Sequence, residues 1–179
     1  MKITGPQVIS ELREKLQFDM GRHLYAVMGT YGQLSRFEQD DLAQARDPQG
    51  NPFPPPINVN RRLLARIGDD DLRQLGQSEA LHPEAVKRKL GRELENLLAE
   101  LLKERSFLIL KQLEIIFAYS LDLGVFRTQA TNQSHVLVLL PGERRSERIT
   151  LFHEGDPRFC RFLPPNLVAD NHLWELRDG

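Results

Sequence analysis

A leucine stripe in the segment from Pro83 to Leu121 constrains the fold more than any other feature of the sequence. Pro83 suits the first turn of a helix. Apolar residues then recur at helical spacing, at Val86, Leu90, Leu94, Leu97, Leu98, Leu101 and Leu102. A single helix to Leu121 would extend about 58 Å, whereas a compact domain of this length has a radius of gyration of about 16 Å. The segment therefore breaks near Arg105 and Ser106, or it projects and buries the stripe against another chain.

The stretch from Phe107 to Leu123 is the most apolar in the chain. Four polar residues interrupt it, namely Lys111, Gln112, Glu114 and Asp122. A helix that spans a membrane needs about 20 predominantly apolar residues, so we interpret this stretch as a buried core helix. Its apolar character on nearly all sides predicts burial against several neighbours.

The first 75 residues are predicted to be mainly helical. Apolar spacing indicates a helix from Pro6 to Phe18. A second series from Met20 to Phe37 keeps nearly the same spacing, but three glycines weaken a helix there, and a strand from His23 to Met28 remains the alternative. Further helices are expected from an N-cap at Asn60 to Gly68, and from Asp69 to Leu75.

A proline-rich segment precedes Asn60. Residues 47–56 hold five of the 11 prolines in the chain. Proline fixes φ and lacks a backbone donor, so neither a helix nor a central strand fits this segment. We predict a loop. The spacing of Pro52 and Pro55 also matches the PxxP pattern of polyproline II ligands, which is the alternative.

After Gly124 the sequence changes to short runs of strand-forming residues separated by turn residues. The predicted strands are Val125–Thr128, Val136–Leu140, Ile149–Phe152, Phe159–Leu163 and Leu173–Leu176. Their connections are too short for the helices that cross over between parallel strands, so we predict antiparallel pairing. The expected fold class is α+β, with a mainly helical domain at 1–124, including the loop at 47–56, followed by a small antiparallel β module at 125–179.

Charge and cysteine content narrow the cellular setting. The 24 Lys and Arg nearly balance the 25 Asp and Glu, so no overall field favours nucleic acid or an anionic membrane. The single cysteine, Cys160, cannot form an internal disulfide, which favours a reducing compartment. The N-terminus lacks the apolar core of a signal peptide. We therefore expect a cytoplasmic protein without a membrane partner.

Motifs for cofactors, nucleophiles and metals do not emerge from the sequence. The glycine patterns GxGxxG and GxxxxGK[ST] are missing, and no serine stands in a GxSxG context. Cys160 lies between Arg158 and Arg161 without an evident base and is interpreted as a structural thiol. The most plausible metal ligands are His135, His153 and His172 with Glu154 or Asp156. Zinc motifs are missing around them, so we predict no metal, no cofactor and no catalytic residue.

The leading functional hypothesis is a non-enzymatic subunit or adaptor that binds a protein partner, or a second copy of itself, through the leucine stripe. The candidate partner-binding residues are Leu94, Leu97, Leu101 and Leu108. An alternative is nucleic-acid binding through a basic hairpin that carries Arg144, Arg145 and Arg148, together with the arginine-rich helices. A second alternative is a small metal-dependent hydrolase built around His153, Glu154 and Asp156.

Overall fold

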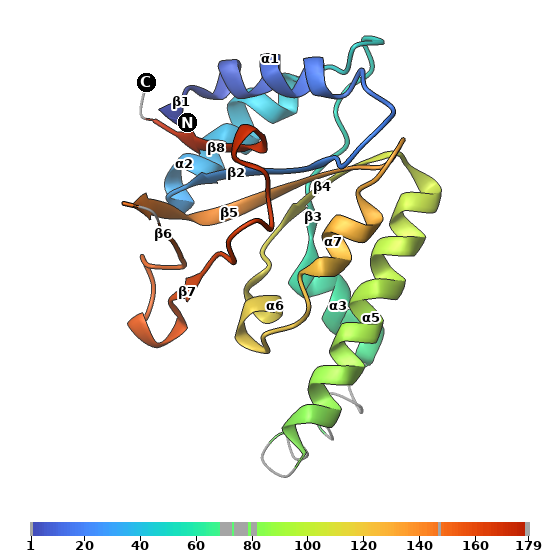
Figure 1. Ribbon diagram of the computed structural model, residues 1–179, viewed down its shortest axis with the longest axis vertical. Coiled ribbons are helices and arrows are strands. Elements are labelled where there is room, and N and C mark those ends of the chain that lie inside the picture. Colours follow the sequence, from blue (N-terminus) through green and yellow to red (C-terminus); the bar gives the residue numbers. More distant parts are fainter. Residues whose placement is uncertain (1, 69–72, 74–78, 80–81, 147, 178–179) are drawn as a thin grey trace.

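A parallel β-sheet runs through the centre of the molecule and carries helices on both of its faces (Figure 1). The computed structural model describes residues 2–68, 73, 79, 82–146 and 148–177. The strands follow the order β1-β8-β2-β5-β4-β3, and every neighbouring pair in this order is parallel. They are β1 (Lys2–Ile3), β8 (Leu173–Leu176), β2 (Leu24–Gly29), β5 (His135–Arg145), β4 (Phe107–Lys111) and β3 (Ile57–Asn58). The arrangement is a Rossmann-like α/β fold.

A short antiparallel extension grows from the end of the central strand β5. Beyond Pro141, β5 pairs with β6 (Arg148–Leu151), and β6 pairs with β7 (Arg161–Phe162). The hairpin predicted between the runs at 136–140 and 149–152 is therefore confirmed. It projects past the carboxyl end of the parallel sheet (Figure 1).

The helices divide into two layers, one on each face of the sheet. One face carries α1 (Gly5–Lys15), α2 (Tyr31–Arg36), the π-helical turn η1 (Phe37–Asp41) and the 3-10 turn η2 (Leu42–Gln44). The other face carries α3 (Val59–Ile67), α5 (Pro83–Glu104), α6 (Glu114–Ala118) and α7 (Gly124–Gln129). Two 3-10 turns, η3 (Pro157–Phe159) and η4 (Asp170–His172), lie in the C-terminal segment. None of the described helices is long and apolar enough to cross a membrane.

The leucine stripe packs inside this chain. Helix α5 ends at Glu104, so the predicted break near Arg105 and Ser106 is confirmed. The four candidate partner-binding leucines are all buried in the core between α5 and the sheet, with Leu94, Leu97 and Leu101 on α5 and Leu108 on β4. The length conflict is resolved because the chain turns back into the sheet at Phe107.

The predicted α+β class is wrong. The stretch from Phe107 to Leu123, expected to form one core helix, begins with strand β4. A parallel strand is covered on both faces and therefore reads as apolar on every side, which is also the signature of a buried helix. The expected strand Val125–Thr128 lies within helix α7.

The predicted antiparallel module is wrong for a related reason. Strands β5 and β8, which follow Gly124, join the sheet of the first half of the chain, because β5 lies between β2 and β4 and β8 lies between β1 and β2. The short connections after β5 leave no room for crossover helices, but the helices α6 and α7 that cross over to β5 come before it in the chain. The alternative strand at 23–28 is confirmed as β2.

The helices α1 and α3 lie close to their predicted positions. Helix α1 confirms the first predicted helix, and Gly68 ends α3 as expected. The N-cap of α3 is Asn58 rather than Asn60, since the Asn58 side chain accepts a hydrogen bond from the Arg61 N–H at 2.8 Å. Apart from residue 73, the helix expected from Asp69 to Leu75 lies outside the described residues.

We predict that Leu94→Ala lowers the free energy of unfolding by about 2–5 kcal/mol, because it leaves a cavity in the core. Leu94 is 1% exposed, whereas Leu64 on α3 is 37% exposed and provides the control. Leu64→Ala should change stability by about 0.5 kcal/mol or less. Urea denaturation measures both variants. Light scattering should find the same oligomeric state for both, and dissociation caused by Leu94→Ala would contradict an intramolecular role.

Candidate functional site

The connections that leave strands β2 and β4 run to opposite faces of the sheet. Strand β2 leads into α2 on one face, and β4 leads into α6 on the other, while β5 lies between the two strands. In open α/β sheets, such a divergence opens a crevice at the carboxyl ends of the strands, where ligands bind. A ligand site is therefore expected at this end of the sheet.

A pocket of about 350 Å³ lies at that position. Its lining combines the first residue of α2, the helix α6 and the segment that follows β6. Most of its side chains are apolar, namely Ile115, Phe117, Ala118, Phe152 and Phe159. Four polar side chains join them: Tyr31, Glu114, Asp156 and Arg161.

The apolar part of the pocket contains a strained residue. The rings of Phe117 and Phe152 pack edge to face with their centroids 5.3 Å apart. Phe152 has a φ of 60°, which is rare for a bulky residue. Its backbone N–H donates to the Pro141 carbonyl oxygen at 2.8 Å, and this bond ties the unusual backbone to β5. Such strain persists where surrounding contacts enforce it, and it often marks functional sites.

A hydrogen-bonded group forms one polar side of the pocket. The Tyr31 hydroxyl donates to Glu114 Oε1 at 3.3 Å, and Asn60 Nδ2 donates to Glu114 Oε2 at 2.7 Å. Asn60 Oδ1 also accepts from the Ile115 N–H at 3.1 Å, so α3 holds the first turn of α6. The Glu114 carboxylate is thereby oriented by two neutral donors.

Tyr31 is a hydrogen-bonding group rather than a base at neutral pH. Burial and the nearby carboxylates of Glu114 and Glu154 raise the pKa of Tyr31 to about 12. The Tyr31 backbone N–H donates to Glu154 Oε2 at 2.6 Å, which links the start of α2 to the loop after β6. The phenol therefore keeps its proton near neutral pH, and that proton makes the hydrogen bond to Glu114.

The other polar side comes from the loop between β6 and β7. Arg158 binds Asp156 with its Nη2 2.6 Å from Oδ2, and this pairing lowers the pKa of Asp156. Arg161 donates from Nη1 to the carbonyl oxygens of Arg158 at 2.9 Å and Cys160 at 2.8 Å. These bonds fold the Arg161 side chain onto its own loop, where it lines the pocket.

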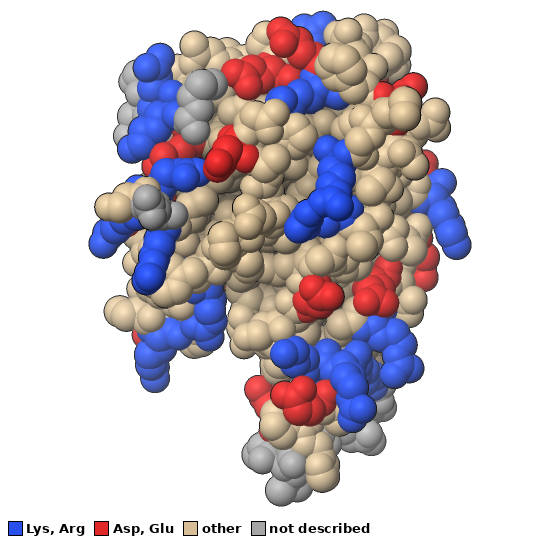
Figure 2. Space-filling model, in the orientation of Figure 1, with Lys and Arg blue, Asp and Glu red and all other residues tan. Residues whose placement is uncertain are grey.

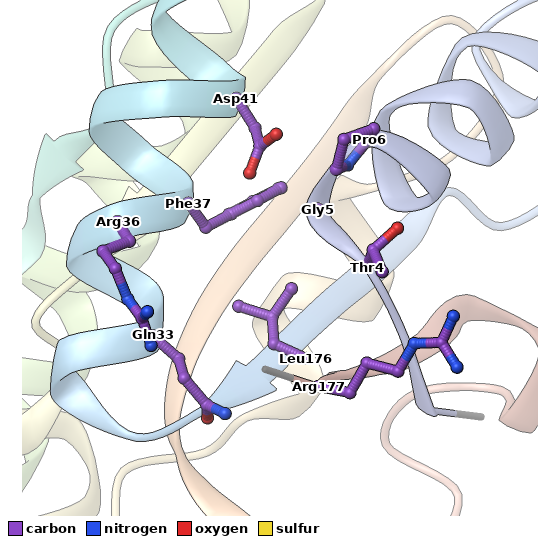
Figure 3. A pocket seen from close by; sticks show the side chains of 9 residues that line it. All are labelled: Thr4, Gly5, Pro6, Gln33, Arg36, Phe37, Asp41, Leu176 and Arg177. Carbon is purple, nitrogen blue, oxygen red and sulfur yellow. The ribbon is translucent and has the colours of Figure 1, made fainter. Parts of the chain in front are cut away.

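A second hollow, of about 190 Å³, lies at the carboxyl ends of β1, β8 and β2 (Figure 3). Asp41 from η1 points toward the start of α1, and Phe37 and Leu176 form the floor between them. A Cβ added at Gly5 would lie 1.9 Å from Asp41 Oδ2, so only glycine allows this approach. Asp41 therefore already occupies the space at the start of α1.

The basic hairpin holds the arginines proposed for nucleic acid. Arg145 and Arg148 face each other across β5 and β6. Arg145 Nε lies 2.5 Å from Glu143 Oε1, and the Arg148 guanidinium lies over the Phe162 ring, 5.8 Å from its centroid. Arg144 is their neighbour on β5. Figure 2 shows acidic and basic side chains interspersed over this face of the molecule.

The three histidines that offer the most plausible metal ligands in the sequence do not converge. His135 and His172 lie at the amino end of the sheet, at the start of β5 and just before β8, whereas His153 lies beyond β6 near Glu143. Within the described ranges, no group of three or more His, Cys, Asp or Glu side chains could hold a metal ion. Glu154 and Asp156 instead belong to the loop beside the pocket.

The amino end of the sheet holds a buried cluster of histidine and tyrosine. The rings of His23 and His135 stack with centroids 4.2 Å apart, and their side chains are 4% and 5% exposed. The Tyr25 hydroxyl lies 3.1 Å from His23 Nδ1 and 3.4 Å from His135 Nδ1. Burial and the neighbouring His23 lower the pKa of His135 to about 4, while Asp19 acts in the opposite direction.

Sequence reasoning missed the main residues of the pocket, which are Tyr31, Glu114, Phe152 and Arg161. They lie far apart in the chain and match no motif. The usable signal was positional, because Tyr31 and Glu114 come just after apolar strands. That signal becomes informative only when both strands are known to be parallel.

No protein-family model matches the chain, and comparisons with curated proteins and with solved structures found no significant match.

We predict that stability falls as the pH drops from about 6.5 toward 4. Burial lowers the pKa of His23, His135 and His172, so the unfolded chain binds protons that the folded chain does not. His135→Gln should reduce the slope of unfolding free energy against pH by up to about 1.4 kcal/mol per pH unit. Exposed His82 provides the control. Denaturant melts between pH 4 and 7 that give equal slopes for His135→Gln and wild type would refute this assignment.

Proposed function

We propose that the protein binds a small, mainly apolar organic molecule in the pocket at the carboxyl ends of β2, β4 and β5. The observation that carries this proposal is the convergence of apolar side chains from α6 and the loop after β6 with the polar pair of Tyr31 and Glu114. Pockets for small ligands are mainly apolar, with a few placed polar groups that fix orientation.

The size and position of the pocket support this function. Ligand pockets commonly enclose about 300–1,000 Å³, and a pocket of about 350 Å³ suits a molecule of one or two rings. The aromatic side chains Phe117, Phe152 and Phe159 offer ring edges and faces to such a molecule. Phe159 is 58% exposed, and an apolar ligand beside it would remove part of this ring from water.

The adaptor and nucleic-acid hypotheses have less support. The four leucines proposed for partner binding pack in the core of this chain, and Arg145 and Arg148 contact Glu143 and Phe162. Acid–base chemistry is also less favoured than binding, because a tyrosine with a pKa of about 12 keeps its proton near neutral pH. Binding of a small molecule would involve both the apolar and the polar side chains of the pocket.

We predict that the neutral fluorophore N-phenyl-1-naphthylamine binds at one saturable site, with the fluorescence increase of an apolar environment. Ala118→Trp should weaken this binding at least about 10-fold, because the added ring occupies part of the pocket. Ala118 is exposed, so the fold should tolerate the change, which circular dichroism verifies.

Ala85→Trp provides the matched control, since Ala85 is exposed on α5 and does not line the pocket. It should leave the affinity unchanged. Absence of saturable binding, or binding that Ala118→Trp does not weaken, would refute the proposed function.

A further inference from the structure

We propose that the ligand of this pocket is an amphipathic anion, with an apolar body and one carboxylate, sulfonate or phosphate group that Arg161 binds. This inference rests on the proposed function and names the class of ligand. It depends on the charges of the lining and on how each of them is engaged within the chain.

Arg161 is the cation of the pocket lining, and among the described residues no carboxylate pairs with it. Its Nη1 donates to the carbonyl oxygens of Arg158 and Cys160, which are neutral acceptors and leave the positive charge uncompensated. Across the part of the chain that the structure describes, no Asp or Glu oxygen lies within 4.0 Å of the Arg161 guanidinium nitrogens. Nε and Nη2 remain as donors for a ligand.

Asp156, the acidic residue of the lining that is closest in sequence to Arg161, is already paired with Arg158. Asp156 lines the same pocket, but Arg158 holds both of its oxygens, with Nε 3.1 Å from Oδ1 and Nη2 2.6 Å from Oδ2. The Arg158 backbone N–H also donates to Oδ1 at 2.9 Å. Arg158 therefore neutralises Asp156, whereas Arg161 keeps its positive charge at the pocket.

Glu114 is the remaining carboxylate of the lining and is oriented elsewhere. Tyr31 and Asn60 donate one hydrogen bond to each of its oxygens, so it is held toward α2 and α3. Arg161 belongs to β7. The lining of the pocket thus combines a carboxylate held by two neutral donors, a guanidinium without a carboxylate partner among the described residues, and aromatic rings.

This combination fits an anion with an apolar body. Charge-assisted hydrogen bonds from a guanidinium to an oxyanion are about twice as strong as neutral ones, and the planar group can bind two oxygens at once. Beside apolar side chains the interaction is screened less than in water. A neutral molecule of the same shape would not form an ion pair with the Arg161 guanidinium.

Two fluorophores that share the same rings test this inference. N-phenyl-1-naphthylamine is neutral, and 1-anilinonaphthalene-8-sulfonate carries a sulfonate on the same body. We expect the sulfonate to bind about 10-fold more tightly than the neutral probe, and each probe to displace the other from one site. Arg161→Gln should abolish this preference while the affinity for the neutral probe changes less than about twofold.

Arg148→Gln is the matched control, because it removes the same charge on the adjacent strand β6, outside the pocket lining. It should preserve the preference. Equal affinities of wild type for the two probes, or a preference that survives Arg161→Gln, would overturn the inference while the proposed function stands. Loss of neutral-probe binding in Arg161→Gln would also overturn it, since Arg161 would then shape the pocket instead of binding the anion. If wild type binds neither probe, the proposed function itself fails.

Discussion

The pairing of strand β5 between β2 and β4 is the constraint on which the rest of the structure depends. Residues Val136–Leu140 of β5 are all buried, and their side chains alternate between the two cores of the molecule. Leu24 of β2 lies opposite Val136, which in turn lies opposite Leu108 of β4. A slip of one residue would exchange the side chains of the two cores, so the packing of both helix layers fixes this register. Beyond Pro141 the same strand forms a hairpin with β6, and the segment that follows β6 lines part of the pocket.

Local structure was more predictable from the sequence than topology. The periodicity of α1 and α5 and the turn between β5 and β6 are encoded by neighbouring residues, and these elements were predicted correctly. Pairing between distant segments is not encoded locally. Strand β1 at Lys2–Ile3 pairs with Glu175 and Leu176 at the other end of the chain. The apolar run of β4 adds a further ambiguity, since a buried helix and a buried parallel strand have the same hydrophobic pattern.

The pocket was less predictable than the fold because its residues are distant from one another in the sequence. Its residues come from three segments that only the parallel sheet brings together. The loop around Cys160 illustrates a second cause. Strand alternation was expected through Phe159–Leu163, but Pro157–Phe159 form a 3-10 turn and only Arg161–Phe162 are extended. Asp156 accepts the Arg158 N–H at the start of this turn and also pairs with the Arg158 guanidinium, which leaves Arg161 as the uncompensated arginine.

A close approach of two strands and one positive φ shape the wall formed by the hairpin. A Cβ added at Gly142 would lie 2.6 Å from the Thr150 carbonyl oxygen, so glycine is needed for the close approach of β5 and β6. Phe152 then takes its positive φ, at a cost of about 1–3 kcal/mol. The aromatic contact with Phe117 and the hydrogen bond to Pro141 offset this cost. Because contacts within the chain hold Phe152 in place, the wall is formed before any ligand binds. A preformed wall reduces the ordering entropy lost on binding, and this is the advantage that would justify a strained residue in a pocket.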